Sequence, residues 1–187
     1  MSTRGASPPS AADPLTAAAA RFRDGLAAVV GASPPGLVLL AVSGGADSMA
    51  MLTLAAAAGL SGGIAVATVD HRLRAAAADE AAMVADHCAR IGIPHATLCP
   101  DAPIEGASVQ AQARAARYAL LADHARAIGA VAIATAHHVD DQAETFLMRA
   151  ARGSGLAGLA GVRERSVIAD AVVVRPLLDW RRAELRA

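Results

Sequence analysis

The sequence predicts an α/β protein: a doubly wound, mainly parallel sheet of five strands with helices on both faces. The first observation behind this prediction is the alternation of short apolar runs with segments whose apolar residues recur at helical spacing. The second is a glycine-rich turn at 43–48 that joins the first apolar run directly to a helical pattern. The third is that polar motifs follow the ends of the apolar runs, where parallel sheets bind their ligands.

A single domain accounts for the length of 187 residues, which is too short for two domains of ordinary size. Residues 1–14 are rich in Ser, Ala and Pro, so we expect a disordered N-terminal lead there. The folded domain is expected over 15–187. It opens with a helix over 15–30, which Gly31 and the Pro34-Pro35 pair bring to an end.

The remaining elements are predicted to alternate along the chain. Short apolar runs predict buried strands, and the segments between them have the length and periodicity of helices. We expect strands at 37–42, 63–69, 95–99, 130–135 and 167–174. We expect helices at about 48–59, 76–91, 108–128 and 140–151.

The composition argues against several classes of protein. The 17 basic residues, all arginine, balance 17 acidic ones, so no net charge attracts nucleic acid from a distance. Only 2% of the residues are aromatic, which leaves no stacking platform for single-stranded nucleic acid. We see no signal peptide and no stretch long enough to cross a bilayer. Cys88 and Cys99 lack metal-ligand spacing and are expected to be reduced thiols, so the expected location is the cytoplasm.

The turn Ser43-Gly44-Gly45-Ala46-Asp47-Ser48 has the features of a phosphate-binding loop. Its glycines let the backbone approach a ligand, and the first N–H groups of the following helix point at that ligand. Ser43 and Ser48 can add hydroxyl donors, and Asp47 can hold Mg²⁺ beside phosphate oxygens. The turn lacks the Lys-Ser/Thr pair of a Walker loop and the third glycine of the dinucleotide fingerprint.

Two further polar segments are expected at the same edge of the sheet. The segment Asp70-His71-Arg72-Leu73-Arg74 follows the second strand, where an ordinary polar turn is the alternative interpretation. In the helix at 108–128, Arg114 and Arg117 are three residues apart and share a face. That face is either solvated or directed at phosphates, which arginine binds through two parallel hydrogen bonds. Their coincidence with the glycine loop favours the phosphate-binding interpretation.

The segment 135–145 follows the fourth strand, and its sequence is Thr135-Ala136-His137-His138-Val139-Asp140-Asp141-Gln142-Ala143-Glu144-Thr145. Acidic side chains are favourable near the N-terminus of the helix that starts here. An acidic helix cap is the plain interpretation of this pattern. A divalent metal cluster for hydrolysis is another, although such sites normally need further spaced ligands, which we do not find.

Taken in order, these motifs resemble the family of tRNA(Ile)-lysidine synthetases, within the N-type ATP pyrophosphatases of the PP-loop superfamily. The glycine loop alone is typical of the whole superfamily. The run from Ala136 through Glu144 to Arg152-Gly153-Ser154-Gly155 is far more specific, and Arg175-Pro176-Leu177-Leu178 then leads to a helix start at Arg182. One departure from the family's pattern is Gln110, because an acidic residue is often found at this position, before the segment Ala111–Tyr118.

The resemblance implies a Rossmann-like fold of the adenine nucleotide alpha hydrolase type. Members of the family usually continue past the Arg-Pro-Leu-Leu segment into further helices and C-terminal domains. The region 15–187 is therefore expected to be a PP-loop catalytic domain that is truncated at its C-terminal end.

The function implied by the resemblance is ligation of free L-lysine to C2 of the wobble cytidine of tRNA(Ile) with the CAU anticodon. ATP first adenylates the cytidine, so the products are lysidine, AMP and pyrophosphate. ATP and Mg²⁺ are the implied cofactors, a homodimer remains open, and no membrane partner is expected. The implied catalytic residues are Asp47, Arg114 and His137. The implied ATP ligands are Ser43, Gly44, Gly45, Ala46, Asp47 and Ser48, with Asp47 also binding Mg²⁺. The implied ligands of lysine are Asp140, Asp141 and Glu144. Supporting residues of the site as a whole are Asp70, His71, Arg74, Arg117 and Arg152.

Two other functions remain open at the level of sequence. One is another PP-loop enzyme, such as a tRNA thiolase or an amide-forming synthetase. Thiolation would want cysteines in the motifs, whereas Cys88 and Cys99 lie outside all of them. The other is a non-catalytic ATP-binding module of the stress-protein type, which places its glycine loop late in the chain rather than after the first strand.

Overall fold

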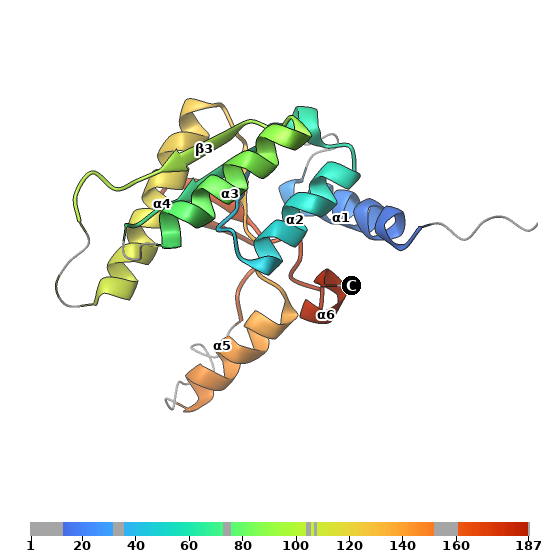
Figure 1. The fold of residues 1–187 in the computed structure, drawn as a ribbon. Coiled ribbons are helices and arrows are strands. Elements are labelled where there is room, and N and C mark those ends of the chain that lie inside the picture. The colour runs from blue at the N-terminus through green and yellow to red at the C-terminus, as the bar shows by residue number, and fades with distance from the viewer. Residues whose placement is uncertain are drawn as a thin grey trace, which may run out of the picture.

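The computed structural model describes residues 13–31, 36–72, 76–103, 106, 108–151 and 161–186. They form a central sheet with helices around it (Figure 1). The helices are α1 (Pro14–Val30), α2 (Ala46–Ala57), α3 (Ala76–Ile91), α4 (Val109–Ala127), α5 (Val139–Ala151) and α6 (Arg182–Leu185), with a short 3-10 helix, η1 (Ser61–Gly63). The strands are β1 (Val38–Ala41), β2 (Ile64–Val69), β3 (His95–Leu98), β4 (Ala132–Ala134), β5 (Arg165–Ile168) and β6 (Ala171–Val174). Helix α1 includes Pro14, the last residue of the predicted lead, and residues 1–12 lie outside the described residues.

The sheet has six strands in the order β3-β2-β1-β4-β6-β5. Each neighbouring pair from β3 to β6 is parallel, with Leu39 of β1 opposite Ala65 of β2 and Ile133 of β4. The order reverses between β1 and β4, which is the place where doubly wound sheets bind ligands. The predicted doubly wound, mainly parallel sheet is confirmed, with one more strand than expected.

The sixth strand arises because the segment predicted as one strand at 167–174 is part of a hairpin. Strand β5 runs antiparallel to β6, and Ala169 and Asp170 form the turn between them. Both turn residues have positive φ, 50° and 60° respectively. This is the backbone that a two-residue hairpin needs to follow the twist of its strands. The sequence lacks the Asn-Gly or Asp-Gly pair that usually announces such a turn, so the apolar run appeared continuous.

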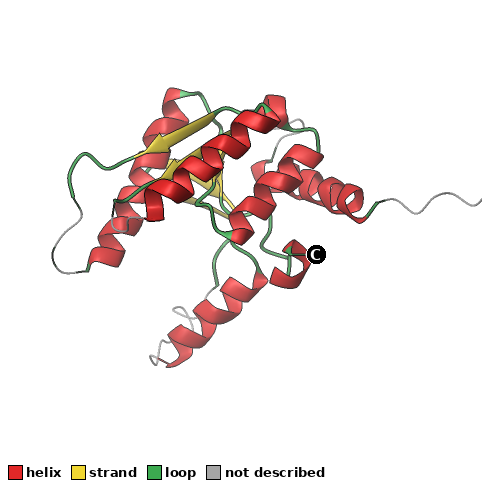
Figure 2. Cartoon of the chain, viewed as in Figure 1, coloured by secondary structure: helices red, strands yellow, loops and turns green. Residues whose placement is uncertain are grey.

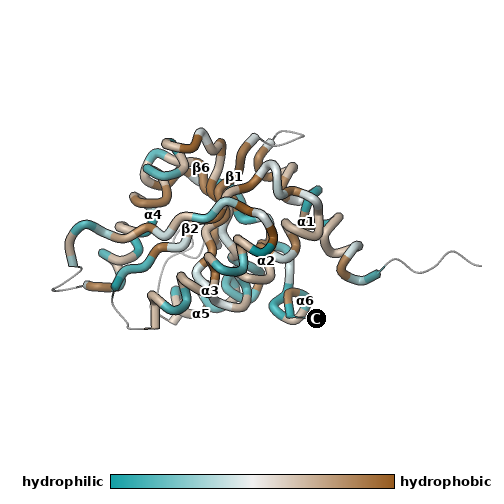
Figure 3. Tube along the Cα trace, turned by 45° about the horizontal axis from the view of Figure 1, so that its top comes forward, coloured by the Kyte–Doolittle hydropathy of each residue, from teal (hydrophilic) through white to brown (hydrophobic). Residues whose placement is uncertain are grey.

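Helices cover both faces of the sheet, so β1 is buried on both of its sides. Val38, Leu40 and Val42 face a core shared with α1, α2 and α3, in which Phe22 and Met51 are fully buried. Successive side chains of a strand point to opposite faces, so Leu39 faces the other core, which α4 covers. Figure 2 shows the strands as the layer between these helices, and Figure 3 shows the hydrophobic residues gathered along β1 and β6.

Helix α5 is the exception to this layered packing. It extends away from the sheet (Figure 1), and it contains no buried residue. Phe146, Leu147 and Met148 are 48%, 65% and 55% exposed. The first turn of α5 carries Asp140 and Asp141, and Glu144 follows on the next turn. Asp140 and Glu144 contact Arg182 near the C-terminal end of the described chain. Within the part of the chain that the structure describes, no helix has the length and apolar character needed to span a bilayer.

The central position of β1 leads to a stability prediction. Val38 is fully buried in β1, whereas Val167 is 71% exposed on the edge strand β5. We expect Val38→Ala to lower the free energy of unfolding by about 2 kcal/mol, since it removes buried methyl groups and leaves a cavity. Val167→Ala makes the same chemical change at the surface and should cost less than about 0.5 kcal/mol. Urea unfolding of both variants measures the difference, and equal losses would contradict the role assigned to β1.

Candidate active site

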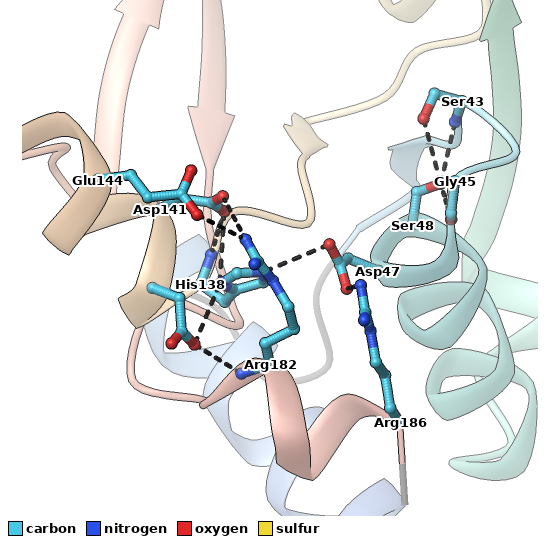
Figure 4. A network of polar contacts seen from close by, with 10 residues as sticks. Ser43, Gly45, Asp47, Ser48, His138, Asp141, Glu144, Arg182 and Arg186 are labelled. Carbon is cyan, nitrogen blue, oxygen red and sulfur yellow. Dashed lines mark hydrogen bonds and ion pairs between the residues drawn. The ribbon is translucent and has the colours of Figure 1, made fainter. Parts of the chain in front are cut away.

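The glycine loop lies where β1 ends and α2 begins. Gly44 has φ of 86°, a conformation that other residues rarely adopt. Ser48 Oγ donates a hydrogen bond to the Gly45 carbonyl at 2.8 Å and accepts one from the Ser43 N–H at 3.2 Å (Figure 4). The loop is therefore held in shape before any ligand binds, at the positive end of the α2 dipole.

A cavity of about 260 Å³ opens above this loop. Part of its lining is apolar and includes Ala67, Val69 and Leu121, and the rest, called the rim below, is polar. The rim comes from the loop, from α4 and from the segment after β4, and it includes Asp47, Arg117, His137 and Asp141. An apolar slot with a few convergent polar groups at the switch point of an α/β sheet is a typical nucleotide pocket.

A second, larger cavity of about 620 Å³ adjoins the first and shares Ser43, Gly45 and Arg117 with it. His71 and Gln110 line its other side. Both ring nitrogens of His71 are buried and have no hydrogen-bond partner among the described residues. The two cavities thus adjoin each other at the loop.

One wall of the site is basic. Burial lowers the pKa of His137, and the positive charge of Arg175 lowers it further. Burial and the charge of Arg117 also lower the pKa of His71. The Arg114 guanidinium stacks on the Tyr118 ring, 5.2 Å from its centroid. The imidazoles of this wall are therefore neutral near pH 7, and the arginines supply its positive charge.

The acidic wall of the site is built around His138, which is fully buried. Asp47 and Asp141 of this wall line the first cavity, whereas Asp140 and Glu144 line neither of the two cavities. The His138 Nε2 lies 3.3 Å from Asp47 Oδ2, and its Nδ1 lies 3.6 Å from carboxylate oxygens of both Asp140 and Asp141 (Figure 4). Asp141 Oδ2 accepts the His138 N–H at 2.9 Å, which closes the N-terminus of α5. His138 thus connects the phosphate loop to the first turn of α5.

Two arginines are added to this acidic wall by α6 and the residue that follows it. Arg182 Nη2 donates to Glu144 Oε1 at 3.0 Å, and the Arg182 backbone N–H donates to Asp140 Oδ2 at 2.7 Å. That backbone hydrogen bond is the main reason why the pKa of Asp140 is lowered. Arg186 Nη2 lies 3.7 Å from Asp47 Oδ1. Arg21 of α1 fixes α6 in place through Glu184, at 2.8 Å.

The structure brings together most of the residues that the sequence pointed to. The loop residues, Arg117, His71, His137 and the acidic residues of α5 lie at one end of the sheet. Asp70 is buried, lines neither cavity, and accepts the Arg72 N–H at 2.8 Å, so it shapes the turn after β2. Arg74 and Arg152 lie outside the described residues.

Sequence reasoning missed two residues of this site. The sequence indicates His138 only as the neighbour of His137, although its ring lies between Asp47, which follows the glycine loop, and Asp140 in the first turn of α5. Arg182 was seen only as the start of a helix, and its partner Glu144 is 38 residues away. Periodicity carries no information about such a distant pair. The position of Arg182 after the Arg-Pro-Leu-Leu segment was the one available signal.

The donor set at the loop fits Mg²⁺ bound jointly by protein and phosphate. Asp47 Oδ1 is buried and has no hydrogen-bond partner among the described residues. Magnesium in phosphate sites is typically held by one or two carboxylates together with the phosphates. Within the described ranges, no group of three or more His, Cys, Asp or Glu side chains is placed to hold a metal ion. The metal-cluster interpretation of 135–145 therefore gains no support from these residues.

Comparison with known proteins identifies the class that this fold and loop define. Residues 18–187 match the family described as the PP-loop domain, and the chain belongs to this family. Membership implies the use of ATP. The U34-tRNA thiolase NcsA from Methanococcus maripaludis has a similar structure, with a TM-score of 0.69 at 16% sequence identity over 92% of this chain and 61% of that chain. At that identity the likeness shows the fold alone.

Curated relatives are similar in sequence as well. The tRNA(Ile)-lysidine synthase of Novosphingobium aromaticivorans is 53% identical over 176 residues, which are 92% of this chain and 52% of that protein. The tRNA(Ile)-lysidine synthase of Zymomonas mobilis is 45% identical over 168 residues, which are 88% of this chain and 50% of that protein. The chain thus spans about half the length of the curated relatives it matches.

The geometry of Gly44 leads to a prediction about ATP binding. A Cβ at Gly44 would lie 3.3 Å from Glu80 Cβ and would require an L-residue at positive φ. We expect Gly44→Ala to lower the free energy of unfolding by about 1–2 kcal/mol through that backbone strain. We also expect it to weaken ATP binding by about tenfold or more, because the loop must shift away from the phosphates.

Gly59 supplies the matched control. It also has positive φ, 72°, but a Cβ there would meet nothing within 4 Å. Gly59→Ala should therefore cost similar stability and leave ATP binding unchanged. Thermal unfolding and equilibrium binding of ATP, measured on both variants, separate the two effects. Unaltered ATP affinity in Gly44→Ala would contradict the assignment of the loop.

Proposed function

We propose that this chain is the PP-loop part of a tRNA(Ile)-lysidine synthase. It would use ATP to join free L-lysine to C2 of the wobble cytidine in tRNA(Ile) with the CAU anticodon. The observation that carries the proposal is a site with two walls of opposite charge that meet at the phosphate loop. Such a site suits an anionic nucleotide and a cationic amino acid at once. The names of the curated relatives support the same activity.

The first proposed step is adenylation of the cytidine. The cytidine O2 attacks the α-phosphorus of ATP, the new O–P bond forms, and the bond to the β-phosphate oxygen breaks to release pyrophosphate. The loop N–H groups, the Ser43 hydroxyl and Arg117 bind the charge that develops on the phosphates. Ser48 lines the same cavity, and its hydroxyl, which donates to the Gly45 carbonyl, holds the loop in shape. Arg114 on the next turn would add positive charge from outside the cavity. When bound, Mg²⁺ would neutralise further phosphate charge, and Asp47 would hold it.

The second proposed step is attack of a lysine amine on C2 of the adenylated cytidine. The C–N bond forms, the C–O bond to AMP breaks, and the amine loses a proton. His137 is the proposed acceptor of that proton, since it lines the cavity and its lowered pKa keeps it neutral. Its ring is oriented by the 2.9 Å contact between Nδ1 and Thr135 Oγ1. Asp140, Asp141 and Glu144 would bind an ammonium group of lysine.

The cysteines favour this activity over tRNA thiolation. The sequence contains only Cys88 and Cys99, and neither lines the two cavities. Cys88 is fully buried in the core, where burial raises the pKa of its thiol. A thiol that is buried and protonated is a poor nucleophile and a poor metal ligand.

The test of the proposal is pyrophosphate release from ATP with Mg²⁺, lysine and tRNA(Ile) carrying the CAU anticodon, with each component omitted in turn. Release that depends on this tRNA, together with incorporation of labelled lysine, would support lysidine synthesis. Release without lysine incorporation would indicate another tRNA-activating enzyme. ATP binding without any release would indicate a nucleotide-binding module, and would contradict the proposal for this chain.

Asp47→Asn is expected to lower the rate of pyrophosphate release by about a hundredfold or more, because a transition-state charge contact is lost. The amide keeps the size of the side chain but not the charge that would bind Mg²⁺. Asp86→Asn, an exposed position on α3, is the control for the charge change and should leave the rate unaltered. Comparable rates in wild-type protein and Asp47→Asn would overturn the role given to Asp47.

The lowered pKa of His137 leads to a prediction about the pH dependence of the reaction. Because burial and Arg175 lower its pKa below the usual 6.5, activity should rise with pH through an apparent pKa below 6.5 and then level off. The same shift stabilises the folded protein above pH 6.5, and this stability is lost as the pH falls through the folded-state pKa. His137→Gln should remove the rise, whereas His87→Gln on α3 should keep it. A rate profile without a rise in wild-type protein would count against His137 as the proton acceptor.

A further inference from the structure

The acidic wall already holds a cation that belongs to the chain itself. The Arg182 guanidinium contacts Glu144 at 3.0 Å and lies 3.9 Å from Asp141 Oδ1, and its Nε lies 3.4 Å from His138 Nε2. Figure 4 shows this side chain between the α5 carboxylates and the phosphate loop. A ligand ammonium that binds these carboxylates must therefore meet the Arg182 guanidinium there.

The three α5 carboxylates are not equally able to accept a new partner. Asp140 accepts the backbone N–H of Arg182, and Asp141 accepts the backbone N–H of His138. Both contacts hold helix ends in place, so their loss would disturb α5 and α6. Glu144 is 59% exposed, and its contact with Arg182 is made between two side chains. Glu144 is thus the carboxylate that can change partner without moving the backbone.

Charge balance determines which ligands can favourably replace Arg182 as the ion-pair partner of Glu144. A ligand that brings only ammonium groups would take Glu144 and leave the Arg182 guanidinium, of its two ion pairs with Glu144 and Asp141, only the longer 3.9 Å contact to Asp141. A ligand that brings an ammonium and a carboxylate can take Glu144 and supply a new partner for Arg182. Glu144 and Arg182 then each have a side-chain partner of opposite charge both before and after binding.

We propose that Arg182 is a specificity-determining residue that selects a free amino acid over a simple diamine, by exchanging its partner Glu144 for the α-carboxylate of the ligand. This inference rests on the proposed function, because it takes lysine as the ligand of the acidic wall. The planar guanidinium suits the task, since it can bind a carboxylate through two parallel hydrogen bonds. Arg182 thereby binds the part of lysine that the α5 carboxylates cannot.

The test compares the binding of L-lysine with that of cadaverine, which is lysine without its carboxylate. Dissociation constants are measured by calorimetry on the chain with ATP and Mg²⁺ and without tRNA, so that no cytidine is adenylated. Wild-type protein should bind lysine more tightly than cadaverine. In Arg182→Gln, we expect the preference for lysine to fall by about threefold to tenfold, the range of one partly exposed charged contact.

The variants are chosen so that folding does not decide the result. Arg182→Gln keeps the backbone N–H that Asp140 accepts, and Arg21 still holds α6 through Glu184. Arg182→Lys keeps the positive charge but loses the planar guanidinium that can donate two parallel hydrogen bonds, so it should retain part of the preference for lysine. Arg181→Gln makes the same charge change one residue away, on an exposed side chain, and should keep the full preference. Equal melting temperatures would confirm that all variants are folded.

The outcomes separate this inference from the function on which it rests. A lysine preference that falls in Arg182→Gln but not in Arg181→Gln supports the exchange of partners. A preference that is unaltered in Arg182→Gln, with lysine still bound, overturns the inference and leaves the proposed function standing. If wild-type protein binds neither ligand, the acidic wall is not a lysine site, and both the lysine assignment and this inference fail.

Discussion

The burial of His138 between carboxylates is the interaction on which the site depends. Its imidazole is fully buried and lies within 3.6 Å of Asp47 on one side and of Asp140 and Asp141 on the other. The His138 Nε2 accepts a hydrogen bond from Arg182 Nε at 3.4 Å, whereas its Nδ1 has carboxylate neighbours but no hydrogen-bond partner among the described residues. A buried polar ring is costly without polar neighbours, so these contacts favour keeping the elements together as a unit. The phosphate loop, the first turn of α5 and the start of α6 therefore keep a common arrangement, although they come from distant parts of the chain.

The parallel sheet determines where this unit can form. The strands from β3 to β6 that are parallel end on the same side, so the loops that follow them converge there. Burial of β1 on both faces fixes the direction of the glycine loop relative to α2 and α4. The apolar lining suits the uncharged part of a nucleotide. In the proposed function, the two charged walls would face its phosphates and a cationic ligand. The rigid strands thus position the loops, and the short polar loops carry the side chains proposed to bind ligands and to react.

Much of the fold could be predicted from the sequence because its elements are local. The strands at 63–69 and 95–99 and the helices at 76–91 and 108–128 are observed within one or two residues of the expected bounds. The prediction of a single strand at 167–174 is wrong, because Ala169 and Asp170 form a hairpin turn. These two residues adopt positive φ although they are not a typical turn signal. That conformation depends on pairing between β5 and β6, and pairing cannot be recognised from an apolar run alone.

By itself, the sequence determined the fold class, the phosphate loop and the clustering of polar motifs at one end of the sheet, because periodicity and glycine spacing are properties of neighbouring residues. Only the tertiary structure decided which histidine joins the two walls and which cation occupies the acidic one. His138 and Arg182 act through partners that the fold brings close from 44 residues apart. The energy of such a pair depends on distance and burial, and neither quantity exists until the chain has folded.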